Sequence, residues 1–214
     1  MGDAAEAPRE CPLCPRLVSF RLANRAAEPA WHNGAVASFG PADARLLIVG
    51  LAPGLKGANR TGRPFTGDFA GDLLYETLLA FGFARGTYAA RADDGLALVD
   101  CMITNSVRCV PPENKPTPAE IATCRQFLAS RIASLPRLAA ILALGRIAHD
   151  STLAALGVRK SPFPFAHGAR HDVRPNLPLF DSFHCSRYNT NTGKLTPEMF
   201  RTVVSDVRSK LGAA

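Results

Sequence analysis

What this 214-residue chain lacks excludes several classes of protein. Its longest apolar runs, such as 138–144, are far shorter than the roughly 20 residues that a membrane-spanning helix needs. The first ten residues, Met1–Glu10, carry neither the basic region nor the apolar stretch of a secretory signal peptide. The sequence also shows no internal repeat and no low-complexity block. We therefore expect a cytoplasmic protein that does not associate with a membrane.

The composition is that of an ordinary soluble domain. Hydrophobic residues make up 47% of the chain and charged residues 20%, and the length allows one buried core, so we expect a single domain over 1–214. We also expect a monomer. The net charge of +7 suits a polyanionic partner, because each neutralised phosphate releases counterions. The competing interpretation is a solvated basic surface without such a partner.

Alternating sequence patterns predict an α/β fold. Short apolar runs predict strands over 45–50, 96–104, 138–144 and 177–184. Helical signals lie between and after them: a leucine stripe over 73–79, a capping box at 117–120, a short helix over 145–156 and a last helix opening at Thr196. We predict a three-layer α/β/α sandwich around a central, mainly parallel four-stranded sheet. Sites in such folds form at the carboxyl ends of strands, here the loops 50–54, 105–109 and 184–191.

Six cysteines are unusual for a chain in a reducing compartment, where disulfides are disfavoured: Cys11, Cys14, Cys101, Cys109, Cys124 and Cys185. Cys11 and Cys14 form a C-x-x-C motif, and with Cys109 and Cys124 they could enclose a zinc ion or a four-iron cluster. The alternative is that Cys109 and Cys124 are small buried apolar residues. We interpret Cys101 as a core residue, and Cys185 as either structural or close to a substrate.

Three segments and the C-x-x-C motif carry a family resemblance. They are Gly50-Leu-Ala-Pro-Gly54, the run 103–112 with Asn105 and Cys109, and the run 184–193 that begins with His184. In this order they resemble the iron–sulfur members of the uracil-DNA glycosylase superfamily. Several relatives carry an acidic or amide residue at the position of Leu51, so the chain is most similar to the type 5, or type B, branch, which lacks it and tolerates more bases. Cys185 departs from the proline of many members.

The resemblance implies an activity and a set of site residues. It implies a hydrolase that removes uracil and other deaminated bases from damaged DNA, which initiates base excision repair. It also implies that Phe65 stacks on the flipped base, that Asn105 reads the edge of the base, and that His184 faces the leaving base. The resemblance further implies a [4Fe–4S] cluster on four ligands: Cys11, Cys14, Cys109 and Cys124.

The residue chemistry agrees with that activity. Breaking the glycosidic bond leaves an electron-poor sugar and an anionic base, and His184 can donate a hydrogen bond where the negative charge develops. The backbone of Ala52 and Gly54 and the carboxylate of Asp68 are candidates for holding the attacking water. Gly50, Leu51 and Pro53 complete the expected substrate loop, where glycine lets the backbone come close to a base.

Each of these residues also has a structural interpretation. Phe65 can be a core residue, Asn105 a turn or cap residue, and His184 a structural histidine. Asp68 can be a helix N-cap or a solvated side chain, and Asp72 competes with it for either role. We assign no function to His149, His167 or His171, although His167 lies in a predicted loop near the site.

A polar segment after His184 is expected to contact DNA through Ser186, Arg187, Tyr188, Asn189 and Asn191. The alternative is a solvated turn. Because no lysine stands in the matched motifs, we expect no lyase step. Two other functions compete with the glycosylase: a non-catalytic iron–sulfur or zinc module that binds DNA, and an unrelated zinc hydrolase. Four cysteine ligands would close the coordination sphere of zinc, which argues against the hydrolase.

Overall fold

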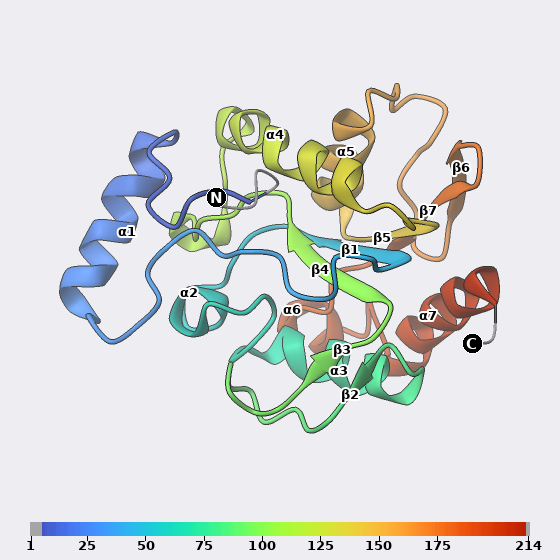
Figure 1. The fold of residues 1–214 in the computed structure, drawn as a ribbon, viewed down its shortest axis with the longest axis horizontal. Coiled ribbons are helices and arrows are strands. Elements are labelled where there is room, and N and C mark those ends of the chain that lie inside the picture. Colours follow the sequence, from blue (N-terminus) through green and yellow to red (C-terminus); the bar gives the residue numbers. More distant parts are fainter. Residues whose placement is uncertain (1–5, 213–214) are drawn as a thin grey trace.

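The computed structural model describes residues 6–212. Residues 1–5 lie outside the described residues, and they begin the N-terminal segment in which the sequence shows no signal-peptide features. A five-stranded sheet forms the centre of the molecule, in the order β4-β1-β5-β7-β6 (Figure 1). The strands are β1 (Leu46–Gly50), β4 (Cys101–Asn105), β5 (Ala140–Leu144), β6 (Arg170–Arg174) and β7 (Leu177–Ser182). The four predicted strands are parallel to one another, and β6 runs antiparallel to β7 at the edge.

Alternate side chains of the central strands feed two separate cores. Leu46 and Ile48 of β1 pack in the core beneath helices α3 (Phe69–Ala80) and α7 (Pro197–Leu211). Leu47 and Val49 pack in the core beneath α4 (Pro118–Ser134) and α5 (Arg146–Ala155). The predicted three-layer α/β/α sandwich is therefore confirmed, with α4 and α5 above the sheet in Figure 1 and α3 and α7 below it. The helices are α1 (Pro15–Ala27), α2 (Ala58–Thr61), α3 (Phe69–Ala80), η1 (Pro112–Asn114), α4 (Pro118–Ser134), α5 (Arg146–Ala155), α6 (Arg187–Asn191) and α7 (Pro197–Leu211).

Helix boundaries follow the capping residues. The Glu120 backbone N–H donates to Thr117 Oγ1 at 3.2 Å, and the Thr117 N–H donates to Glu120 Oε2 at 2.7 Å, which confirms the predicted capping box of α4. Thr196 Oγ1 caps α7 by accepting from the Met199 N–H at 3.2 Å. No helix within residues 6–212 has the length and apolar character needed to cross a bilayer.

Three details differ from the sequence prediction. The strand predicted over 96–104 is broken at Asp100, whose φ of 55° turns the chain and whose carboxylate accepts from Arg45 Nε at 2.7 Å. Before this break, β3 (Ala97–Leu98) pairs with β2 (Ala84–Arg85) in a separate small sheet. The sheet has five strands rather than four, because β6 adds to its edge. The segment after His184 is not only a loop, since Ser186 caps the short helix α6.

Candidate functional site

The loops at the carboxyl ends of the parallel strands enclose a cavity of about 640 Å³. Gly50 and Asn105 are register partners at the ends of β1 and β4, and His184 follows the end of β7. The structure brings together almost all of the predicted catalytic and base-binding residues around this cavity: Leu51, Ala52, Pro53, Gly54, Phe65, Asp68, Asn105 and His184. Gly50 lies beside them without lining the cavity.

Gly50 is required by crowding rather than by backbone conformation. A Cβ at this position would lie 2.4 Å from Asn105 Oδ1 and 2.7 Å from Phe65 Cζ. Only glycine allows the amide and the aromatic ring to approach the end of β1 together. Asn105 Oδ1 is itself buried and has no hydrogen-bond partner within the described part of the chain. An unsatisfied buried acceptor is expensive, so this oxygen is available to a ligand with a donor group.

Phe65 is held in an uncommon backbone conformation. Its φ is 52°, in the left-handed region that bulky residues avoid. The preceding carbonyl, Pro64 O, accepts from Tyr75 Oη at 2.6 Å, and Phe65 O accepts from Tyr88 Oη at 3.3 Å. Arg63 forms a buried two-pronged ion pair with Asp94, with N–O distances of 2.7 and 2.8 Å. The side chain of Phe65 both contributes to the core and lines the cavity, so its two interpretations are compatible.

His184 faces Phe65 across the cavity. The two rings are stacked with centroids 5.7 Å apart and an angle of 28° between their planes. Burial lowers the pKa of His184 to about 4, so the imidazole is neutral at physiological pH. Its backbone carbonyl accepts from Asn189 Nδ2 at 2.8 Å. A neutral imidazole can donate one hydrogen bond without carrying a charge into the cavity.

Asp68 lies against the glycine loop. A Cβ on Gly54 would come within 2.8 Å of Asp68 Oδ2, and one on Gly57 within 2.2 Å. Asp68 occupies the N-cap position of α3, but its side chain makes no capping hydrogen bond, and its buried Oδ1 has no partner within residues 6–212. Burial raises the pKa of Asp68. The carboxylate thus lines the cavity from the N-cap position of α3, and the exposed Asp72 does not line the cavity.

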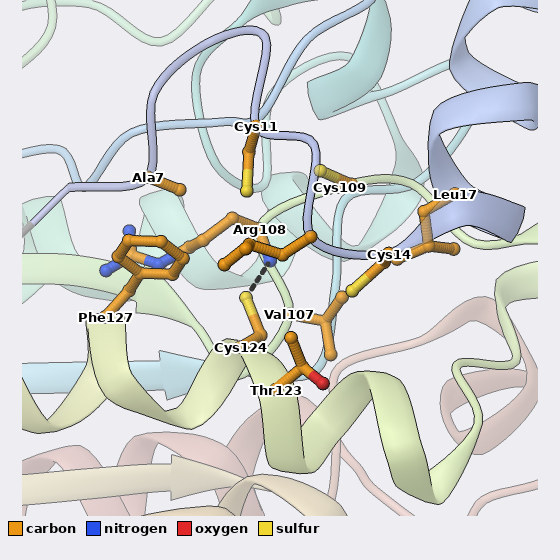
Figure 2. Close-up of a pocket in the computed structure, with 11 residues that line it drawn as sticks. Ala7, Cys11, Cys14, Leu17, Val107, Arg108, Cys109, Thr123, Cys124 and Phe127 are labelled. Atoms are coloured by element: carbon orange, nitrogen blue, oxygen red, sulfur yellow. Dashed lines mark hydrogen bonds between the residues drawn. The ribbon is translucent and has the colours of Figure 1, made fainter.

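The second feature is a group of four cysteines from three segments. Cys11 and Cys14 precede or begin α1, Cys109 follows β4, and Cys124 lies on α4; Figure 2 shows their sulfur atoms facing a common space. Three of them are buried, and Cys14 is partly buried. The Arg108 backbone N–H donates to Cys124 Sγ at 3.3 Å, and Arg21 Nη1 lies 3.9 Å from Cys109 Sγ.

This sulfur cradle fits an iron–sulfur cluster. Burial raises the pKa of Cys109 to about 12 and that of Cys124 to about 11, so these thiols would ionise only beside a cation. A single zinc ion with four thiolates places the sulfurs about 3.8 Å apart. Within residues 6–212, the group whose potential ligand atoms all lie within 4.8 Å of one another is His149, His171 and Asp181, not the cysteines. N–H donors to cysteine sulfurs, as at Cys124 and Cys109, are typical of a cluster site.

The segment predicted to contact DNA has mixed roles. Ser186 Oγ and the amide of Asn189 hold α6 and the His184 carbonyl in place. Arg187 is exposed, and its guanidinium carbon lies 5.2 Å from the centre of the Phe69 ring at the cavity. Tyr188 is 74% exposed, and Asn191 is exposed at the end of α6. Arg187, Tyr188 and Asn191 are thus accessible to a partner.

Several residues near the site were missed by sequence reasoning. Lys56, Phe69 and Asn114 also line the cavity. Arg146 and Lys194 line a neighbouring hollow that His184 shares. These residues lie in segments without a motif, and only folding brings them to the site. Cys101 and Cys185 are both fully buried and belong to the core beneath α3 and α7.

The chain matches the family model for the uracil DNA glycosylase superfamily over residues 37–208. It is 44% identical over 208 residues to a type-5 uracil-DNA glycosylase of Thermus thermophilus, covering 94% of each chain. It is 40% identical over 212 residues to a type-5 uracil-DNA glycosylase of Mycobacterium bovis, covering 94% of this chain and 78% of that protein. A type-4 uracil-DNA glycosylase of Thermotoga maritima is 31% identical over 213 residues, covering 97% of this chain and 91% of that protein.

Proposed function

Since the chain belongs to the uracil-DNA glycosylase superfamily, we propose that it hydrolyses the N-glycosidic bond of uracil in DNA and so initiates base excision repair. We also propose that other deaminated bases are substrates. The observation that carries the proposal is the cavity that is lined by a stacking ring, an unsatisfied amide oxygen, a neutral imidazole and a half-buried carboxylate.

The target base must leave the DNA stack before it can enter such a cavity, at a cost of a few kcal/mol. Phe65 offsets part of this cost by stacking on the flipped base. Asn105 Oδ1 accepts a hydrogen bond from the edge of the base, which satisfies an oxygen that is otherwise buried without a partner. The aliphatic side chain of Leu51 offers no hydrogen bond to the base or to water.

Cleavage requires stabilisation of charge at both ends of the breaking bond. His184 donates a hydrogen bond to the departing base, where negative charge develops. Asp68, beside Gly54, takes the role of orienting the attacking water and stabilising the cationic sugar. Its raised pKa makes the carboxylate a better acceptor for a water proton than an exposed aspartate. The backbone of Ala52 and Gly54 completes this end of the cavity.

The four cysteines Cys11, Cys14, Cys109 and Cys124 would hold a [4Fe–4S] cluster, which supplies structural support. Their loop is bonded directly to the site, since the N–H groups of Ser106 and Val107 donate to Gly50 O and Leu51 O, each at 2.9 Å. The purified protein should be brown and contain iron, and Cys109→Ser should remove the colour. Colourless, active protein that contains only zinc would exclude the cluster.

The experiment for the function uses duplex oligonucleotides that each carry one lesion: uracil, hypoxanthine or xanthine. Wild-type protein should release the base and leave an abasic site without cutting the strand. His184→Ala should slow single-turnover release by on the order of a hundredfold or more on every substrate. Binding of these duplexes with no base release under any condition would instead indicate a non-catalytic DNA-binding module.

A further inference from the structure

Three histidines outside the cavity all contact the strand that leads to His184. His149 on α5 and His171 on β6 bond the two carboxylate oxygens of Asp181, at 2.8 and 3.0 Å. His167 Nδ1 accepts from the Phe183 backbone N–H at 3.2 Å. Asp181 lies in β7, and Phe183 immediately precedes His184. We call His149, His167 and His171 the histidine ladder.

His149 and Asp181 share a buried proton. His149 Nδ1 faces a carboxylate oxygen of Asp181, and His149 Nε2 faces the Phe163 carbonyl oxygen at 2.9 Å. Because a carbonyl oxygen only accepts, Nε2 carries a hydrogen, and a second proton must lie between Nδ1 and Asp181. Both residues are almost fully buried, so neither can replace this hydrogen bond with one to water. It links α5, β7 and the segment before β6.

The same contacts argue against a metal ion at this place. The ligand-type atoms of His149, His171 and Asp181 lie within 4.8 Å of one another. A metal ligand must offer a lone pair, but both nitrogens of His149 face oxygen acceptors and so carry the protons. Asp181 already accepts a hydrogen bond on each oxygen.

His167 joins the ladder to the residue before His184. Its ring lies flat against the Phe183 ring, with centroids 5.0 Å apart and an angle of 13° between the planes. Burial lowers the pKa of His167, so the ring is neutral and Nδ1 carries the lone pair that accepts the Phe183 N–H. The adjacent backbone is fixed to β7 as well, because the Gly168 N–H donates to Asp181 O and the Asp181 N–H to Ala169 O, both at 2.9 Å.

We propose that the histidine ladder is a positioning device that fixes the backbone ahead of His184, so that the imidazole reaches the leaving base at the required place. His149 and His171 hold the β7 side chain of Asp181, and His167 holds the first amide beyond the strand. None of the three lines the cavity that holds the base, and His167 reaches only the neighbouring hollow that His184 shares, so we place their action on His184 and not on the substrate. This inference rests on the proposed function of His184.

The test compares two replacements of His167. His167→Phe keeps an aromatic ring against Phe183 but removes the acceptor, whereas His167→Asn keeps an acceptor oxygen near the Nδ1 position. His167→Phe should slow single-turnover excision by about ten- to a hundredfold, as expected for a small misplacement of a reacting group. Its affinity for lesion DNA and its Tm should stay close to wild type, and His167→Asn should restore most of the rate.

The matched control is His32→Phe, the same change at a histidine that bonds the Ala35 carbonyl far from β7 in sequence. It should leave excision unchanged. The inference is overturned if His167→Phe excises at the wild-type rate, or if rate, DNA affinity and Tm all fall together. It is also overturned if a stoichiometric divalent metal, such as zinc, copurifies and is lost in His171→Ala.

A second readout does not depend on activity. In NMR spectra of the imidazole groups, His167→Phe should shift the His184 signals, and the His149 signals should titrate with a pKa above the ordinary histidine value because of its bond to Asp181. If wild-type protein releases no base, the proposed function fails, and the His184 shift still decides whether the ladder sets its position. Unchanged His184 signals in His167→Phe would refute the ladder.

Discussion

Gly50→Ala introduces one methyl group at the most crowded point of the cavity. The new Cβ would lie 2.4 Å from Asn105 Oδ1 and 2.7 Å from Phe65 Cζ, whereas ordinary contacts begin at 3.4 Å. Asn105 must therefore retreat by about 1 Å. Neither neighbour can move freely, because Asn105 ends a buried strand and the carbonyls around Phe65 are bound by Tyr75 and Tyr88.

A displacement of this size in a group that positions the substrate costs on the order of a hundredfold in rate. Single-turnover excision of uracil from a duplex should fall by about that factor, while the iron content stays at the wild-type level. The variant should bind an abasic-site duplex nearly as well as wild type, since α6 is unchanged. A rate within about twofold of wild type in a folded variant would refute the crowding argument.

Gly34→Ala is the matched control. A Cβ on Gly34 would also crowd a neighbour, at 2.6 Å from Arg9 Cγ. The Arg9 side chain is 59% exposed and can move aside, unlike the groups around Gly50. The same substitution should therefore leave excision unchanged. Equal losses in the two variants would indicate a general effect on folding.

Three further predictions follow from the charges. Asp68→Asn should slow the chemical step by roughly 10²–10⁴-fold and leave lesion binding intact, and wild-type activity should fall as pH drops through the raised pKa of Asp68. Because burial raises that pKa, the ionised carboxylate costs stability at neutral pH, so the variant should have an equal or higher Tm. Arg187→Ala should weaken binding to all duplexes and reduce the slope of log K against log salt by about one, and an unchanged slope would remove Arg187 from the phosphate contacts. Burial alone would lower the pKa of His149, but its bond to Asp181 outweighs burial and raises the pKa; the groups that face the ring are Asp181, His171 and Asp150. The stability that His149 contributes should therefore be present below its unfolded pKa of about 6.5 and be lost as pH rises through the folded pKa, and His149→Gln should remove that pH dependence of Tm.

The layers of this fold are predictable because they depend on local patterns. The run 45–50 is apolar throughout, as a strand covered on both faces must be, and Thr117 with Glu120 fixes the start of α4. By contrast, the sequence of β6 is mostly polar, and it becomes a strand only because β7 offers a free edge. The break at Asp100 depends on a distant arginine, Arg45, which no local pattern reveals.

The site follows the same division. The family resemblance supplied Phe65, Asn105 and His184, and the structure places them around one cavity. The crowding at Gly50 and the unsatisfied oxygen of Asn105 could not be predicted, because they depend on distances between loops that are far apart in the chain. The role of the histidine ladder was equally hidden, since its members are spread over α5, β6 and the turn before β6 and carry no motif.

The features that destabilise this protein are concentrated in the same cavity. Phe65 has a left-handed backbone, Asp68 and Asn105 each bury an oxygen without a partner among the described residues, and the half-buried His184 is a neutral ring. Each costs on the order of 1–3 kcal/mol and persists only where surrounding contacts fix it. Those contacts are present: the buried Arg63–Asp94 pair and the tyrosine hydroxyls hold the Phe65 loop, and the ladder holds β7. Rigid surroundings thus keep unsatisfied groups directed into the cavity, which is what selective stabilisation of a flipped nucleotide requires.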